Sequence, residues 1–249
     1  MKVVLLRFDA PLMSFGGVVV DQHNRTDAFP YRAMLTGLIA NALGMSRRDE
    51  DAVHALQCRI RYAARRDRSG TEMVDYQTVD LGAEGPMADG LGWTTLGRLE
   101  RRGGGDASDG THIRYRHYLA DAIITVALTL DPEHDDPTLS VVSEALKSPA
   151  RPLFIGRKCC IPSGRMWLGE VEAPSLRQAL EATPIDATRA DRGPWRAVWP
   201  EHEGTEGPTR LWPRVEDRDK RNAIHVGRRV YCEGLVHAPS APAITKEEA

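Results

Sequence analysis

The sequence predicts an α+β fold of the ferredoxin-like type. The order β-α-β occurs twice along the chain, and a glycine- and arginine-rich stretch separates the two occurrences. The chain has 249 residues, of which 41% are hydrophobic, so it can bury a sizeable core. We therefore expect one main domain that carries a protrusion, followed by a smaller C-terminal part.

The first β-α-β unit lies within residues 1–64. Val3 to Phe8 is apolar at nearly every position, which is typical of a strand buried on both faces. Phe29-Pro30 begins a helix that ends before Gly44, a residue suited to the position after a helix. The apolar residues of this helix recur at the spacing of an amphipathic stripe: Tyr31, Met34, Leu35, Leu38, Ile39 and Ala42. A short helix from Asp49 to Leu56 and a strand from Cys58 to Ala64 complete the unit.

Residues 82–110 have the composition of a protrusion. Nine glycines fall in this stretch together with Arg98, Arg101 and Arg102, and few apolar residues accompany them. Such a segment cannot bury enough surface to fold alone, so we expect an extended hairpin. The sequence predicts strands on both sides of it, from Met73 to Val79 and from His112 to Leu119.

The second β-α-β unit begins with the alternating strand Asp121 to Leu130. Asp136-Pro137 has the composition of a helix start, with an N-cap aspartate and proline at the first helical position. The buried stripe of this helix is predicted to comprise Leu139, Val142 and Leu146. Two strands, Leu153 to Ile155 and Met166 to Val171, should flank a glycine-bearing loop at 156–164.

The remaining residues give weaker signals. We expect a helix from Ser175 to Glu181, a closing strand from Arg229 to Gly234 and a frayed tail from Pro239 to Ala249. The chain is accordingly divided into a domain at 1–171, interrupted by the protrusion at about 80–117, and a small C-terminal domain with its tail at 172–249.

Several functional classes are excluded by composition. No apolar run approaches the roughly 18 residues that a membrane helix needs, and the N-terminal apolar stretch is too short for a signal peptide, so a cytoplasmic location is expected. The four cysteines form no C-x-x-C pair and no zinc-finger spacing with histidine. We therefore expect no metal and no cofactor.

Arginine is the informative cation of this chain. Five of its 33 basic residues are lysine, which leaves 28 arginines, although the net charge is −2. The guanidinium fork suits phosphates and stacks on bases, but a GC-rich genome also enriches arginine, so only clusters are informative. Four clusters occur: Arg25 with Arg32; Arg61, Arg65, Arg66 and Arg68; Arg98, Arg101, Arg102, Arg114 and Arg116 among Trp93, Tyr115 and Tyr118; and Arg157, Lys158 and Arg165. One such cluster is usually a solvated surface, whereas four on one scaffold predict a nucleic-acid ligand.

Catalytic motifs are scarce. The sequence lacks a phosphate-binding G-x-x-x-x-G-K-[ST] motif, a dinucleotide-binding G-x-G-x-x-G motif and a zinc-protease H-E-x-x-H motif. The segment His112 to Tyr118 is the candidate for metal-independent RNA cleavage, since a histidine base there would have arginines beside it. Strand alternation places His112 and His117 on opposite faces, which argues against an acid–base pair. We predict that the chain is not an enzyme, with RNA cleavage as the alternative.

Eight segments in the first 170 residues resemble the CasD family, the subunit of the type I-E CRISPR surveillance complex Cascade that binds the 5′ end of its RNA. The segments are Leu6–Gly16, Arg25-Thr26, Phe29–Arg32, Gly37–Ala40, Ala42–Met45, Asp75–Thr78, Tyr118–Ala122 and Gly156–Ser163. Their common order along the chain is more specific than any one of them. The last 80 residues resemble the family only near Arg228 to Gly234.

This resemblance implies a RAMP-type ferredoxin-like domain with a β-hairpin thumb and a small C-terminal β-rich domain. It also implies binding of the 5′ handle of CRISPR RNA (crRNA), contact with the backbone and large subunits of Cascade, and only indirect contact with target DNA. Type I-E members do not cut RNA, whereas the related type I-C members do. Together with the arginine clusters it predicts these RNA-binding residues: Arg25, Arg32, Trp93, Arg98, Arg101, Arg102, Arg114, Arg116, Arg157 and Lys158. A structural subunit whose arginines face acidic protein surfaces is a further alternative.

Overall fold

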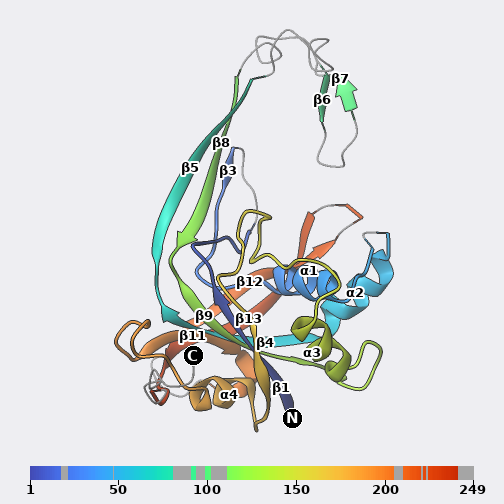
Figure 1. Ribbon diagram of the computed structural model, residues 1–249. Coiled ribbons are helices and arrows are strands. Elements are labelled where there is room, and N and C mark those ends of the chain that lie inside the picture. Colours follow the sequence, from blue (N-terminus) through green and yellow to red (C-terminus); the bar gives the residue numbers. More distant parts are fainter. Residues whose placement is uncertain are drawn as a thin grey trace.

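Figure 1 shows the computed structural model of the chain, with a large sheet from which a long two-stranded arm projects. The described residues are 1–17, 22–46, 48–80, 91–93, 99–101, 111–204, 210–219, 221–222 and 224–240. The mixed α/β composition agrees with the predicted α+β class. The predicted tail from residue 241 onward lies outside the described residues.

The main sheet has seven strands in the order β10-β1-β9-β4-β11-β13-β12, and all neighbouring strands are antiparallel. Their bounds are β1 Lys2–Asp9, β4 Ile60–Arg68, β9 Ile123–Leu130, β10 Trp167–Glu172, β11 Trp195–Pro200, β12 Arg210–Asp219 and β13 Ile224–Val236. Every residue of β9 is buried, because helices cover both faces of the sheet at this strand.

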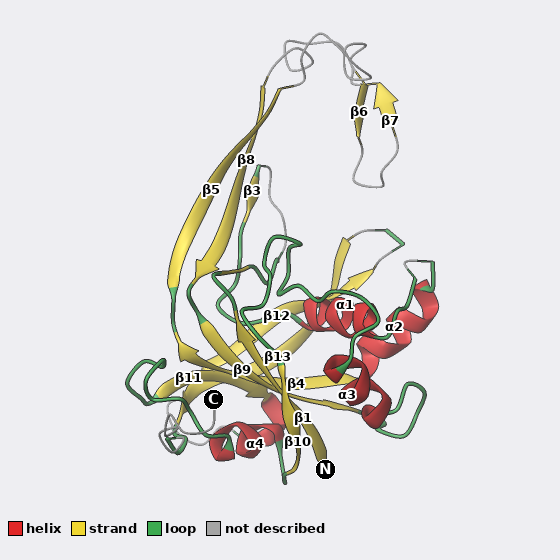
Figure 2. Cartoon of the chain, in the orientation of Figure 1, coloured by secondary structure: helices red, strands yellow, loops and turns green. Residues whose placement is uncertain are grey.

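The helices divide between the two faces of the sheet (Figure 2). Their bounds are α1 Arg32–Ala42, α2 Glu50–Arg59, α3 Leu139–Lys147 and α4 Leu176–Ala182, with a short 3₁₀ helix at Glu201–Glu203. Helices α1 to α3 pack on the face that includes Leu6 and Phe8, whereas α4 packs on the face that includes Val3 and Leu5. Among the described residues, no helix combines the length and apolar character that crossing a bilayer requires.

Strands β5 (Thr71–Asp80) and β8 (Thr111–Ala120) form the projecting arm, hereafter the hairpin arm. They pair over ten residues without a register shift. The other edge of β8 pairs with two short strands, β2 (Leu12–Met13) and β3 (His23–Asn24), while no described strand pairs with the outer edge of β5. The arm thus begins at Thr71, earlier than predicted. Farther along it, β6 (Leu91–Trp93) pairs with β7 (Leu99–Arg101).

Two predicted features of the second β-α-β unit were wrong. Helix α3 begins after Thr138, not at Asp136-Pro137, and the Thr138 hydroxyl accepts a hydrogen bond from the amide of Val141 at 3.3 Å. Leu153 to Ile155 is not a strand. The Ile155 amide instead donates a hydrogen bond to the carbonyl of Cys160 at 2.9 Å and so stabilises the loop that follows.

The C-terminal strands continue the sheet across the predicted boundary at residue 171. Strand β11 pairs with β4 through Ala197 and Val198, and Val198 belongs to the same core cluster as Leu6 and Phe8. The predicted cluster residue Arg65 is buried here, where it pairs with Asp67 and donates to main-chain carbonyls at the end of α4. Neither the sheet nor the core is interrupted at the predicted boundary.

Candidate functional site

An open groove with a volume of about 1460 Å³ lies between the N-terminal loop, α1, the loop after Ile155 and the β12–β13 hairpin. We call it the basic groove. Its described lining holds six lysine and arginine side chains and no aspartate or glutamate. The six are Arg25, Arg114, Arg151, Arg157, Lys158 and Arg218. In a chain with a net charge of −2, this separation of charge makes the electrostatic potential in the groove favourable for an anion.

A glycine holds the predicted cationic loop against the N-terminal loop. Gly156 has φ of +100°, and a Cβ atom there would lie 1.6 Å from the carbonyl oxygen of Ser14, so no other residue fits. The Ser14 amide also donates to the carbonyl of Ile155 at 3.2 Å. This close approach places Arg157 and Lys158 on the wall of the basic groove.

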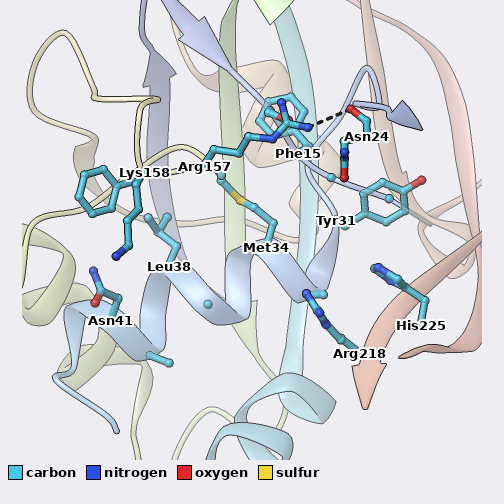
Figure 3. Close-up of a pocket in the computed structure, with 18 of the residues that line it drawn as sticks. Phe15, Asn24, Tyr31, Met34, Leu38, Asn41, Arg157, Lys158, Arg218 and His225 are labelled. Carbon is cyan, nitrogen blue, oxygen red and sulfur yellow. Dashed lines mark hydrogen bonds between the residues drawn. The ribbon is translucent and has the colours of Figure 1, made fainter. Parts of the chain in front are cut away.

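Arg157 connects three segments that line the groove. Its two terminal nitrogens donate to the carbonyls of His117 at 3.0 Å and Asn24 at 2.9 Å, and its guanidinium lies 4.6 Å from the ring centroid of Tyr118. Figure 3 shows the bond to Asn24. A guanidinium has five N–H donors, so three remain for a ligand. Its position agrees with the predicted RNA-binding role, which stays a prediction.

Lys158 and Arg25 are the exposed cations of this part of the groove. The Lys158 side chain points toward Asn41 of α1 (Figure 3). Neither cation forms an ion pair with any residue that the structure describes. Both are therefore available to a ligand at the predicted positions.

Helix α1 gives the groove an apolar surface. Met34 and Leu38 lie along it (Figure 3), and Gly37 between them has no atom within 4 Å of where its Cβ would be. Phe154 lines the groove from the opposite loop. An apolar surface beneath cations suits a chain of phosphates with flat bases.

Arg32 was predicted to bind RNA, and the structure places it elsewhere. Its side chain is fully buried and pairs with Asp217, while its amide donates to Glu216 at 3.2 Å. It therefore does not reach a phosphate in the groove, because it holds α1 against β12. Sequence proximity to the helix start could not distinguish this role from a surface cation.

The neighbouring Arg214 fixes the segment before α1. Its nitrogens donate to the carbonyls of Phe29 and Pro30 at 3.1 Å, and its guanidinium lies 4.0 Å from the ring centroid of Tyr31. Burial and the adjacent Asp27 carboxylate raise the pKa of Tyr31 to about 12, so its hydroxyl stays protonated and donates to Asp27 at 2.8 Å. This buried network fixes the edge of the groove next to Arg25.

The predicted residues of the thumb are described only in part. Arg114 lines the groove, and Arg116 is half-buried two residues farther along β8. Trp93 and Arg101 lie in β6 and β7. Arg98 and Arg102 lie outside the described residues, so the RNA contacts assigned to the thumb tip stay predictions.

Of the two histidine candidates for catalysis, His117 lies away from the groove. His117 Nδ1 is 2.7 Å from Glu72, and its ring is near His23, which stacks on Tyr115 at 4.8 Å. Strand alternation puts these rings on the face of β8 opposite Arg114. Within the described part of the chain, no group of three or more histidine, cysteine, aspartate or glutamate side chains could hold a metal ion.

Three basic residues of the groove, Arg151, Arg218 and His225, were not among the predicted site residues. Arg151 donates to the carbonyls of Gly44 and Met45 at 2.7 and 2.8 Å and so closes the end of α1. Arg218 and His225 come from the β12–β13 hairpin. Arg218 stands between two aspartates in the sequence and belongs to none of the four predicted basic clusters.

Comparison with known proteins identifies the family of the chain. The family described as CRISPR-associated protein (Cas_Cas5) matches residues 3–231. The CRISPR system Cascade subunit CasD of Escherichia coli (strain K12) is 31% identical over 185 residues, covering 71% of this chain and 75% of CasD. A chain of a CRISPR RNA-guided surveillance complex superimposes with a TM-score of 0.67 at 24% identity, covering 97% and 95% of the two chains. A crystal structure of a Cas protein gives a TM-score of 0.62 at 26% identity, covering 96% and 99%. The chain therefore belongs to the CRISPR-associated Cas5/CasD family.

Proposed function

We propose that this chain is a non-catalytic Cascade subunit that binds the 5′ handle of crRNA in the basic groove. The observation that carries the proposal is the groove itself, with six cations and no carboxylate among its described lining residues. Phosphates require fixed cations, and splayed bases require apolar or aromatic surfaces; both lie side by side here. The similar E. coli protein is named a Cascade subunit, which supports the same assembly.

The arrangement of the strands supports the remaining parts of this proposal. The order β10-β1-β9-β4, with α1 and α2 before β4 and α3 before β10, supports the proposal of a ferredoxin-like domain. The hairpin arm projects as a thumb would (Figure 1). We infer that it contacts the backbone subunit and that the chain joins this subunit to the large subunit, with target DNA contacted only indirectly and the complex located in the cytoplasm.

Binding to the CRISPR repeat RNA of the same genome tests the proposal. We expect binding of the purified chain whose affinity falls with salt, with a log–log slope near −0.7 for each phosphate contact. Lys158→Ala should weaken binding by about 1–2 kcal/mol, the scale of a charge-assisted hydrogen bond. Binding that is weak and independent of salt would favour a structural subunit whose arginines face proteins.

A cleavage assay separates binding from catalysis. We expect the isolated chain to leave the repeat RNA intact in EDTA, because the His117 ring faces Glu72 and strand alternation places His112 on the other face of β8, so the two cannot act as an acid–base pair. Metal-independent cleavage that falls a hundredfold or more in His112→Ala or His117→Ala would establish the endoribonuclease instead. Cleavage that survives both changes would come from a contaminating nuclease.

A further inference from the structure

The β12–β13 hairpin presents a pair of basic side chains to the groove. Arg218 of β12 and His225 of β13 are partners in the strand register, and both line the groove. Figure 3 shows them near Tyr31, with Arg157 and Lys158 belonging to another wall. The groove thus has cations on two sides that are far apart in the sequence.

The position of Arg218 is fixed by its backbone. The buried side chain of Gln57 accepts from the Arg218 amide at 3.2 Å and donates to the Arg218 carbonyl at 3.3 Å. This two-point contact ties β12 to α2. Because the backbone of Arg218 is held in place, the side chain loses less conformational entropy when it binds a ligand.

The two aspartates beside Arg218 interact with other residues and do not pair with its guanidinium. Asp217 pairs with Arg32, and Asp219 accepts from the amides of Arg221 and Asn222 at 2.9 and 3.1 Å. Arg218 itself is exposed and forms no ion pair with any described residue. An exposed arginine in a groove that lacks carboxylates among its described lining residues is a ready partner for an anion.

His225 lies beside this cation on the same wall of the groove. Its Nδ1 atom is buried and has no hydrogen-bond partner within the described residues, which is rare for a buried polar atom. Burial and the charge of Arg218 lower the pKa of His225. A hydrogen bond with the backbone of Gly17 opposes this lowering without cancelling it, so the ring is neutral near pH 7 and the charge of the pair is that of Arg218.

We propose that Arg218 and His225 form a second phosphate-binding wall, so that the RNA backbone lies between the β12–β13 hairpin and the loop carrying Lys158. This inference rests on the proposed function and assigns a role to the C-terminal strands. The ligand group is a phosphodiester of single-stranded RNA. The two walls would neutralise adjacent stretches of one strand.

The test compares Arg218→Ala with a matched arginine of the same hairpin. Arg221 is also exposed but is engaged by Glu50 and Asp51 at 3.6 and 3.9 Å, so Arg221→Ala is the control. With fluorescein-labelled CRISPR repeat RNA, Arg218→Ala should bind about tenfold more weakly and lose about 0.7 of the log–log salt slope. His225→Ala should lose about threefold, and Arg221→Ala should bind as the parent does.

The outcomes distinguish this inference from the proposed function. If the parent binds with a steep salt slope and Lys158→Ala weakens binding, but Arg218→Ala has parental affinity, the second wall is overturned and the proposed function stands. If the parent itself shows no salt-dependent RNA binding, both fail. Equal losses in Arg218→Ala and Arg221→Ala would also overturn the wall, because they would reflect net charge. Thermal melting of each variant confirms that it is folded.

Discussion

Arg157 and Lys158 are neighbours in the sequence, yet their side chains do different things. Arg157 donates two hydrogen bonds, to the carbonyls of His117 and Asn24. Lys158 extends into the groove and forms no ion pair with a described residue. An arginine presents several donors in a fixed plane, and a lysine presents one compact charge. The two positions should therefore respond differently when one cation replaces the other.

We expect Arg157→Lys to weaken RNA binding about tenfold although the charge is kept, because one ammonium cannot bond both carbonyls at once. Lys158→Arg should stay within about twofold of the parent. Fluorescence anisotropy with the repeat RNA measures both. Parental affinity in Arg157→Lys would mean that charge alone matters at this position.

Thiol reactivity reports the packing around the cysteines. Burial raises the pKa of Cys160 to about 11 and also raises the pKa of Cys232, whereas Cys58 and Cys159 are exposed. Since the thiolate is the reactive form, iodoacetamide at pH 8 should modify Cys58 and Cys159 in the folded chain. Cys160 and Cys232 should react only after denaturation. Mass spectrometry of peptides reads the result, and fast labelling of Cys160 would contradict its placement.

At the scale of elements, the spacing of apolar residues correctly predicted the helices and strands that have a buried face. Helix α1, β1 and β9 agree with the predicted ranges within a few residues. The start of α3 could not be predicted this way, because Asp136 and Thr138 are both good N-cap residues. The choice depends on a distant side chain: Arg59 donates to the carbonyl of Pro137 at 3.2 Å and holds it outside the helix.

The Thr138 cap can be measured directly. Thr138→Ala should lower the free energy of unfolding by about 1 kcal/mol, the usual effect of losing an N-cap. Ser140→Ala on the exposed side of the same helix serves as the control and should change the stability little. Urea denaturation compares the two. A larger loss in the control would contradict the assignment of the cap.

At the scale of the whole molecule, the C-terminal strands were the part that sequence patterns described least well. Strand β11 lies between β4 and β13, and its pairing with β4 joins residues that are more than 130 positions apart in the sequence. Arg65 and Arg214 are buried. In the sequence they do not differ from exposed arginines, and only the strand pairing shows that they lie in the interior. Local motifs found one wall of the groove, and long-range pairing supplies the other.

A continuous sheet predicts one cooperative unfolding transition. Helices α1 to α3 dominate the far-ultraviolet circular dichroism, while three of the five tryptophans, Trp195, Trp199 and Trp212, lie in the C-terminal strands. The two signals should therefore change at the same temperature. Separate midpoints would show that residues after 171 unfold as an independent unit.

The outer edge of β5, which no described strand covers, has a consequence for how the chain behaves alone. The carboxylates of Glu72 and Asp75 oppose pairing at this edge, but the strand has no proline or bulge, and Val74 and Tyr76 are 50% and 55% exposed on it. Such an edge templates cross-β stacking when molecules are crowded, so the unassembled chain should precipitate at concentrations where its complexes stay dispersed. A gatekeeper charge, Val74→Lys, should raise the concentration at which light scattering appears and leave RNA affinity unchanged. The cell would then have reason to produce this chain no faster than its partners can cover it.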